Sequence, residues 1–564
     1  KNSRETLNNT STVLKGLLAV VPQKQDADRL IKAAEKMTEA ALKGTELFEL
    51  MANTRLSAVG LSAGDKNKEI LERAESLVNE SVALANEASE LINNVSISSI
   101  PENYRSSFIA AKDAANFFEQ NITSIKEVCS LMFDLLLDRS NTLIVFQNNN
   151  ELRANGGFMG TVGNAKLNYG SLDSLDIRSV YDWDGQLNER ILPPQPLYAV
   201  NDRWYLRDSN WFANFPDSAE RISSFFEKEG GETPDLIILM TPEVILDMLE
   251  RTGPIELPQH GITLTTENFI EKTQEATSIT YDKVINQPKL FLADFYPLLM
   301  EKLSNTDANG GAMAFLEVFQ QNLYEKQILL YSRNADIQKK IINFNWGGEL
   351  RNTDRDYLSI VNSNLGGTKT DRNLERSIEL KSSIDSEGTI TNNLTYTVKN
   401  PLPNNPGLLN KSFVRIYVPQ GARLISSSGF DNEIQLPRLN FDDYVRDEQV
   451  AEWEKNLSQD VVTGTYTGTE AGKTWFGNWL EVEGGQTKTI TLSYVLPFKL
   501  GNIDRYSLLI QKQPGSKVGI INYELSFNAR NSLWNSNSSK IEGNQLKYNQ
   551  GLLADSFVGI VLKR

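Results

Sequence analysis

The apolar run Thr142-Leu-Ile-Val-Phe146 and the polar run that follows it, Gln147-Asn-Asn-Asn-Glu-Leu-Arg-Ala-Asn-Gly-Gly-Phe-Met-Gly160, decide the fold. The first run is typical of a buried strand, so the second forms the loop at that strand's carboxyl end. Ligands of α/β proteins bind beside such strand ends. Glycine lets backbone N–H groups approach an anion, and arginine can hold a phosphate through two parallel hydrogen bonds. The loop is therefore either a phosphate-binding segment or an ordinary polar turn with a surface arginine.

The composition excludes several classes of protein. The 564 residues are 40% hydrophobic and 23% charged, which is typical of a globular chain with roughly three or four domains. The 57 basic and 72 acidic residues give a net charge of −15, so we expect no nucleic-acid partner. The loop at 147–160 matches neither a Walker loop nor a Rossmann fingerprint, and no nucleotide is implied.

The chain has one cysteine, Cys129, and one histidine, His260, which limits its chemistry. An internal disulfide, a cysteine-rich zinc site and a cluster of histidine ligands are excluded. Cys129 lies in an apolar helical seam, so we expect a buried, inert thiol. His260 lies in the turn Pro258-Gln-His-Gly261 and is expected to be an exposed loop residue. Any chemistry would then use arginines, carboxylates and a divalent cation.

No segment of the sequence is long enough to cross a membrane as a helix. The longest apolar clusters, at 17–21 and 131–137, fall short of the roughly 20 residues that a bilayer requires. The chain opens at Lys1 on a helical pattern, without an initiator methionine or a signal peptide. We therefore expect that an upstream segment preceded Lys1.

The spacing of hydrophobic residues predicts an α+β protein with three domains. Residues 1–140 have a helical period and predict a helical bundle or stalk. Residues 141–370 alternate strands with helices, which predicts an α/β domain. Residues 371–564 contain short alternating strands between glycine, proline and asparagine turns, which predicts a β-sandwich. The helical period rests on two seams: Ile70, Ala74, Leu77, Ser81, Leu84, Ala88 and Leu91, then Phe108, Ala111, Ala115, Phe118, Ile122, Ile125, Cys129, Met132 and Leu136.

Several elements can be placed within the second and third regions. One helix is expected to begin at Phe215-Pro-Asp217, capped by the aspartate, and another at Pro242 after the capping residue Thr241. Further strands are expected at 142–146 and 234–240, and further helices at 266–276, 290–303 and 312–331. In the third region, strands are expected at 377–380, 393–398, 413–418, 487–495, 506–510 and 556–562.

A second polar cluster, between 176 and 217, combines aromatic and charged residues. Three of the eight tryptophans, Trp183, Trp204 and Trp211, lie here among arginines and aspartates. Flat aromatic faces beside polar groups suit sugar rings or a lipid tail near its headgroup. Paired arginines can neutralise a pyrophosphate, while carboxylates hold the Mg²⁺ that bridges its oxygens. The alternative is a packed loop with core tryptophans and structural Arg–Asp pairs.

Six motifs together resemble those of a bacterial family of unknown function, usually anchored by an N-terminal transmembrane helix and exposed outside the cytoplasm. They are the loop at 147–160, Ser179-Val-Tyr-Asp-Trp-Asp-Gly185, Arg207-Asp-Ser-Asn-Trp211, Phe215-Pro-Asp-Ser-Ala219, Thr252-Gly-Pro254 and Gln511-Lys-Gln-Pro-Gly515. That family is distantly similar to the LytR–CpsA–Psr phosphotransferases. Those enzymes move glycopolymers from polyprenyl-pyrophosphate carriers to the cell wall, with arginines on the pyrophosphate and aspartates on Mg²⁺.

The resemblance implies an extracytoplasmic protein, membrane-anchored or at the cell surface, whose central LytR–CpsA–Psr-like domain binds a polyprenyl-pyrophosphate-linked glycan or a cell-wall polymer. It implies Arg153, Arg207 and Asp208 as catalytic residues. The two arginines would bind the pyrophosphate, and Asp208 with Asp182 would bind Mg²⁺. We further predict that the ligand is contacted by Asn149, Glu151, Gly156, Gly157, Trp183 and Trp211.

Three departures leave glycan transfer open. The catalytic families carry an aspartate beside the first arginine, where this chain has Asn149, Glu151 and Asn155. Their Pro-Arg-Asp strand end is here Val180-Tyr-Asp182, and their Gly-Gly is Gly253-Pro254. If the protein is an enzyme, the resemblance implies a Mg²⁺-dependent glycopolymer phosphotransferase.

The alternative function is a non-catalytic cell-surface protein that self-assembles into a lattice or filament. The stalk-like helices, the β-rich end and the acidic, disulfide-free composition favour this alternative. A soluble hydrolase ranks last, because the chain offers no histidine base and no nucleophile motif.

Overall fold

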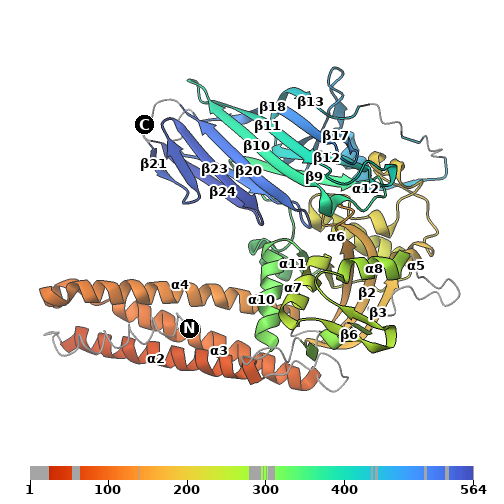
Figure 1. Cartoon of the computed structure of the whole chain (residues 1–564). Helices are drawn as coiled ribbons and strands as arrows, with labels where there is room; N and C mark the ends of the chain where they lie inside the picture. The colour runs from red at the N-terminus through yellow and green to blue at the C-terminus, as the bar shows by residue number, and fades with distance from the viewer. Residues whose placement is uncertain are drawn as a thin grey trace.

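The computed structural model describes residues 24–53, 64–136, 139–278, 294–295, 297–299, 301–302, 311–432, 436–437, 442–500, 505–527 and 532–562. Figure 1 shows three parts: long N-terminal helices, a central body of one sheet with helices, and two large sheets formed by the C-terminal part of the chain. The predicted α+β organisation with a helical N-terminal region is confirmed.

The N-terminal part consists of three long helices, α2 (Lys24–Asn53), α3 (Gly64–Asn93) and α4 (Arg105–Leu136). Arg29, near the start of α2, donates a hydrogen bond to the carbonyl of Asn94, just beyond the end of α3. Leu71, near the start of α3, clusters with Phe133, near the end of α4. Each neighbouring pair of helices is therefore antiparallel, and the three extend away from the rest of the molecule (Figure 1).

The two predicted helical seams are only partly buried. Residues such as Leu77 and Phe108 are fully buried, whereas Ile125 is 55% exposed. Cys129 is half-buried rather than buried, and burial raises the pKa of its thiol. None of the helices in the described ranges has the length and apolar character that a membrane crossing needs.

The central sheet has five strands in the order β3-β2-β1-β5-β8, where the strands are β1 (Arg139–Asn148), β2 (Phe158–Asn168), β3 (Ser171–Ser179), β5 (Leu236–Met240) and β8 (Ile328–Ser332). Only β1 and β5 are parallel, while the other neighbours are antiparallel. The sheet is therefore mixed, and β2 and β3 extend it as a meander that the hydrophobic pattern did not predict. Gly160, Gly163 and Asn164 interrupt the apolar alternation of β2, which hides it from a periodicity argument.

Helices and short strands surround this sheet. The helices are α5 (Val180–Asp184), α6 (Phe215–Lys228), α7 (Pro242–Thr252), α8 (Phe269–Ser278), α10 (Gly311–Tyr324) and α11 (Ala335–Asn343). The short strands are β4 (Ile191–Leu192), which pairs with β14 (Val445–Arg446), and β6 (Ile255–Leu257), which pairs with β7 (Ile262–Leu264).

The starts of two helices were predicted well, but two other expectations need correction. α7 begins at Pro242 directly after Thr241, and α6 begins at Phe215, although its N-cap is Asn214 and not Asp217. The helix predicted at 312–331 is wrong in its second half, because the chain leaves α10 at Tyr324 and forms β8. Of the helix predicted at 290–303, the structure describes residues 294–295, 297–299 and 301–302, and all of these are helical.

His260 lies in a short 3₁₀ turn (Pro258–His260), which agrees with the predicted turn. Its side chain is not fully exposed, because Nε2 lies 2.8 Å from the carboxylate of Asp294.

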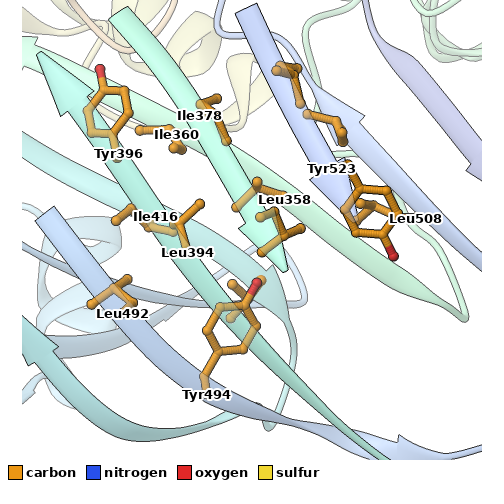
Figure 2. Packing of buried hydrophobic residues seen from close by; sticks show 14 of the residues in the cluster. Leu358, Ile360, Ile378, Leu394, Tyr396, Ile416, Leu492, Tyr494, Leu508 and Tyr523 are labelled. Carbon is orange, nitrogen blue, oxygen red and sulfur yellow. The ribbon is translucent and has the colours of Figure 1, made fainter. Parts of the chain in front are cut away.

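The C-terminal part forms two large sheets that share one hydrophobic core. Figure 2 shows side chains of this core, which include Leu358, Ile416 and Leu508 from one sheet and Ile378, Leu394 and Tyr523 from the other. One sheet has the order β13 (Arg423–Ser428), β18 (Thr487–Lys499), β11 (Thr389–Lys399), β10 (Glu375–Ile384), β20 (Val518–Ser526), β23 (Gln545–Leu552) and β22 (Ser539–Glu542). The other has the order β15 (Ser458–Gln459), β16 (Tyr466–Glu470), β17 (Lys473–Val482), β12 (Asn410–Pro419), β9 (Asp356–Asn364), β19 (Arg505–Gln511), β24 (Ser556–Leu562) and β21 (Ser532–Asn535).

Strand β9 belongs to the eight-stranded sheet, because it pairs with β12 and β19. This sheet therefore begins before residue 370, where the sequence analysis ends the central domain. All nine residues of β9 are buried. A strand that is buried on both faces has no alternating pattern, so its sequence could not be told apart from a strand of the α/β region.

Candidate functional site

A cavity of about 640 Å³ lies at the carboxyl ends of the parallel strands β1 and β5. Phe146 and Gln147 of β1 line it, together with Met240 of β5 and the following Thr241. Ligands of open α/β sheets bind beside the carboxyl ends of the strands. The volume of the cavity falls within the range of roughly 300–1,000 Å³ that small-molecule sites have. The cavity is therefore the candidate site that the described residues offer.

One wall of the cavity is apolar. α7 supplies Pro242 and Ile245, one helical turn apart, and α8 supplies Phe269, Ile270 and Thr273 from one face. Most of the apolar lining belongs to one hydrophobic cluster around these two helices, whose cavity-lining members are Phe146, Met240, Ile245, Phe269, Ile270 and Phe295. This wall suits a hydrocarbon chain.

The other wall is charged and brings together the three residues predicted to be catalytic. Arg153 comes from the loop after β1, and Arg207 and Asp208 come from the loop before α6. Nη2 of Arg153 lies 3.2 Å from Oδ1 of Asp208, and Nε of Arg207 lies 3.6 Å from Oδ2 of the same carboxylate. Asp208 therefore stands between the two guanidinium groups.

Arg153 is almost completely engaged by other groups of the protein. Its side chain is 3% exposed, and Nη2 also donates to Glu151 at 3.1 Å. Nη1 donates to the carbonyl oxygens of Leu152 and Asn364. Burial raises the pKa of Glu151, although the charge of Arg153 opposes that rise. Glu151 also lines the cavity, so Arg153 reaches the cavity wall already paired with two carboxyl groups.

Arg207 is less buried and is positioned by aromatic and acidic neighbours. Its guanidinium carbon lies 4.0 Å from the ring centroid of Tyr205 and 5.4 Å from that of Tyr181, which is 59% exposed. Nη1 donates to Asp184 at 2.6 Å, and Nη2 donates to Asn201 at 2.5 Å. Arg207 is therefore held with one face towards aromatic rings while it lines the cavity.

Two acidic residues close to Arg207 have raised pKa values. Burial raises the pKa of Asp184 to about 6 and that of Glu229 to about 8. The charge of Asp184 adds to the rise at Glu229, whose side chain is fully buried and leaves Oε2 without a hydrogen bond in the described residues. Burial therefore favours the protonated, neutral form of Glu229.

Replacing Glu229 with glutamine tests this protonation state. Because the pKa of Glu229 is higher in the folded than in the unfolded protein, the contribution of this group to stability is fully present below pH ~4.5 and falls as the pH rises towards 8. With the value of about 8, the loss amounts to about 3 kcal/mol by pH 7. We expect urea denaturation between pH 4 and 8 to show a flatter profile for Glu229→Gln. Equal slopes for the variant and the unaltered protein would contradict a protonated Glu229.

The glycine pair predicted to approach a ligand instead lets protein segments approach each other. A Cβ on Gly157 would lie 2.4 Å from the carbonyl oxygen of Asn148, and a Cβ on Gly515 would lie 2.7 Å from that of Gly156. Gly156 has φ +130°, which only glycine adopts readily. Asn149 donates to the carbonyl of Gly515 at 3.2 Å. None of Asn149, Gly156 and Gly157 lines the cavity, which corrects the prediction.

The two tryptophans predicted to contact the ligand are core residues. Trp211 is 1% exposed, its ring packs on Phe413 and Trp453, and the guanidinium of Arg415 lies 4.4 Å from its centroid. Trp183 is buried against Phe226, with 4.7 Å between the ring centroids. Neither lines the cavity, so the alternative interpretation of core tryptophans holds for both.

The two carboxylates predicted to bind Mg²⁺ do not fit that role. Asp182 is an exposed residue of α5 and does not line the cavity. Asp208 is occupied by two arginines and by Nδ2 of Asn201. Within the described ranges, no group of three or more Asp, Glu, His and Cys side chains could hold a metal ion.

The loop at 149–157 joins the central body to the C-terminal sheets. The N–H of Asn364, at the end of β9, donates to the carbonyl of Leu152 at 2.9 Å, and the N–H of Leu152 donates to Asp371 at 3.1 Å. Nε2 of Gln513 donates to the carbonyl of Arg153 at 3.0 Å. The motif at 511–515 is thus the direct partner of the loop at 147–160, and both form the junction beside the cavity.

Sequence reasoning missed several cavity residues, of which Lys369 is the most informative. Lys369 is an exposed cation from the loop between β9 and β10. It follows Gly366-Gly367-Thr368, the same kind of glycine-containing loop with a cation that marked Gly156-Gly157. The sequence therefore contains the pattern of a glycine-containing loop with a cation at both positions. Only the fold shows that the two loops meet at one cavity.

Comparison with known proteins gives little functional guidance. A candidate nutrient-binding protein from Legionella pneumophila is 11% identical with a TM-score of 0.22, over 36% of this chain and 71% of that one. An M1 zinc metallopeptidase from Deinococcus radiodurans is 10% identical with a TM-score of 0.17, over 34% of this chain and 43% of that one. TM-scores this low do not indicate a shared fold or a shared function.

A comparison of the sequence with curated proteins found no match. The expected resemblance to a family of unknown function is confirmed for one segment, which contains the loop at 147–160, Arg207, Asp208, α7 and most of the cavity lining. Residues 138–277 match the family described as "Protein of unknown function (DUF4012)".

Proposed function

We propose that the protein binds an amphiphilic ligand, a polyprenyl-pyrophosphate-linked glycan, in the cavity at the ends of β1 and β5. The observation that carries the proposal is the joining of two unlike walls in one cavity. The wall formed by α7 and α8 is apolar, and the opposite wall contains Arg153, Arg207 and Asp208. A ligand with a hydrocarbon tail and an anionic head matches both walls at once.

The apolar wall would take the part of the prenyl chain nearest the pyrophosphate. Removing apolar surface from water stabilises a complex by about 25 cal/mol per Å², so the tail would supply most of the affinity. The sugar would lie at the exposed ring of Tyr181, which lines the cavity beside Arg207. Exposed aromatic faces suit the apolar faces of sugars.

Binding, rather than transfer, is the core of the proposal. The carboxylate of Asp208 is already engaged by two guanidinium groups, so it is poorly placed to act on a metal or on a nucleophile. We also propose that the central region, predicted at 141–370, forms a LytR–CpsA–Psr-like domain, that the two large sheets form a β-sandwich, and that the protein works outside the cytoplasm. The resemblance of the quoted motifs supports the first and third points, and the hydrophobic core that the two sheets share supports the second.

Three titrations of the full chain test the proposal. Farnesyl pyrophosphate presents both the tail and the head, farnesol presents the tail alone, and inorganic pyrophosphate presents the head alone. We expect farnesyl pyrophosphate to bind most tightly, farnesol more weakly and pyrophosphate weakest, in isothermal titration calorimetry. Equal affinity for pyrophosphate and farnesyl pyrophosphate would reject the apolar wall as part of the site.

Self-assembly at the cell surface is the second candidate function. The observation that favours it is the projection of α2, α3 and α4 away from the body of the molecule (Figure 1). Sedimentation velocity over a wide concentration range distinguishes the two candidates, because an assembling protein shows larger species as its concentration rises. A single monomeric species throughout would remove this candidate.

A further inference from the structure

Three cations line the cavity among the described residues, and they differ in their partners. Arg153 is paired with Glu151 and Asp208, and Arg207 is paired with Asp184 and Asp208. Lys369 has no ion-pair or hydrogen-bond partner within the described part of the chain. The charges of both arginines are therefore compensated inside the protein, while that of Lys369 is not.

The loop that carries Lys369 is fixed by hydrogen bonds at both ends. The side-chain oxygen of Asn364 accepts from the N–H of Gly366 at 3.0 Å, and Nδ2 of Asn364 donates to the carbonyl of Thr368 at 2.9 Å. Oγ1 of Thr368 donates to the carbonyl of Leu409 at 2.6 Å. Asn364 also accepts from Arg153 through its backbone carbonyl. The backbone that presents Lys369 is thus tied to the charged wall of the cavity.

We propose that Lys369 is the residue that recognises the anionic head of the ligand. This inference rests on the proposed function, and it shifts recognition away from the two arginines that the sequence suggested. A phosphate that paired with Arg153 would have to compete with two carboxyl groups in a buried site, where an unpaired charge is costly. A phosphate that binds Lys369 displaces only water. Its charge-assisted hydrogen bond therefore forms without breaking an interaction within the protein.

The site would then be built from two distant parts of the sequence. The tail is bound by α7 and α8 of the central body, whereas the head is bound by the loop between β9 and β10, which connects the two large sheets. Lys369 lies beyond residues 138–277, so the matched family segment alone would bind the tail without selecting the head. The two arginines keep a positioning role, because they hold the charged wall and the loop at 149–157 in place.

The test compares Lys369→Gln with the unaltered full chain. In low salt, we expect the affinity for farnesyl pyrophosphate to fall about tenfold, which is the worth of one charge-assisted hydrogen bond, while the affinity for farnesol stays unchanged. The difference should shrink as salt is added. Lys369→Arg should restore most of the affinity, because the positive charge is kept. Lys540→Gln is the matched control, since Lys540 is an exposed lysine on β22 that does not line the cavity.

The outcomes separate this inference from the proposed function. If Lys369→Gln binds farnesyl pyrophosphate as tightly as the unaltered protein does, Lys369 is not the recognition residue, although the cavity still binds the ligand. If Lys369→Gln loses affinity for farnesol to the same extent, the residue acts on the cavity as a whole and the inference is overturned. If the unaltered protein binds neither compound, both the inference and the proposed function fail.

Discussion

The Arg153→Ala variant is expected to be less stable than the unaltered protein by about 3–5 kcal/mol in free energy of unfolding. Removing the guanidinium leaves Asp208 and Glu151 without their shared partner in a buried site. It also removes the hydrogen bond to the carbonyl of Asn364, which joins the loop after β1 to the end of β9. The loss of one partner from a buried pair is costly because the remaining charge stays desolvated.

Urea denaturation of the full chain measures this loss, with Arg251→Ala as the control. Arg251 forms an ion pair with Glu317 at 2.9 Å, but both side chains are substantially exposed. An exposed pair contributes about 0–1 kcal/mol, so the control should unfold almost as the unaltered protein does. If Arg153→Ala also loses less than about 1 kcal/mol, Arg153 is not a structural residue, and its role as a direct phosphate ligand would regain support.

Filling the cavity from Gly160 is expected to have the largest effect on binding. Gly160 lies in β2 and lines the cavity, and a Cβ on it would touch only the ring of Phe158, at 3.9 Å and beyond. The Gly160→Phe variant therefore places a benzyl group inside the cavity that the ligand would occupy. Losing roughly 100 Å² of buried apolar ligand surface costs about 2.5 kcal/mol, so we expect the affinity for farnesyl pyrophosphate to fall by about 70-fold.

The same substitution at Gly44 is the control for this experiment. Gly44 lies in α2, and a Cβ there meets no atom within 4 Å. Gly44→Phe should leave farnesyl pyrophosphate binding unchanged. Gly160→Phe should keep the unaltered circular dichroism spectrum and a similar melting temperature, since phenylalanine favours strands. Full binding by a folded Gly160→Phe protein would show that the ligand binds elsewhere.

Much of the fold could be predicted where one face of an element is buried and the other is not. The final strand, β24, was predicted with its correct bounds at 556–562, because its apolar run is bounded by turn residues. The start of α7 followed from Thr241 and Pro242, whose backbone preferences act locally. The end of α10 could not be predicted, because the three polar residues at 325–327 fit within a helical period and no glycine or proline separates α10 from β8.

Part of the candidate site could also be predicted from the sequence. Arg153, Arg207 and Asp208 meet because strand ends gather the loops that follow them, which a sequence can indicate. The roles of Gly156 and Gly157 could not be predicted, because a glycine permits close approach by a ligand and by another chain segment equally well. Lys369 could not be placed either, since only the pairing of β9 with β12 and β19 brings its loop to the cavity.

Photoaffinity labelling tests the central claim, that the cavity at the ends of β1 and β5 holds the tail of an amphiphile, most directly. The probe is farnesyl pyrophosphate with a diazirine at the far end of its tail, and labelled peptides are identified by mass spectrometry. We predict labels on α7 and α8, at or near Ile245, Phe269 and Ile270, that excess farnesyl pyrophosphate suppresses. Competable labels confined to the two large sheets or to α2, α3 and α4 would contradict the claim.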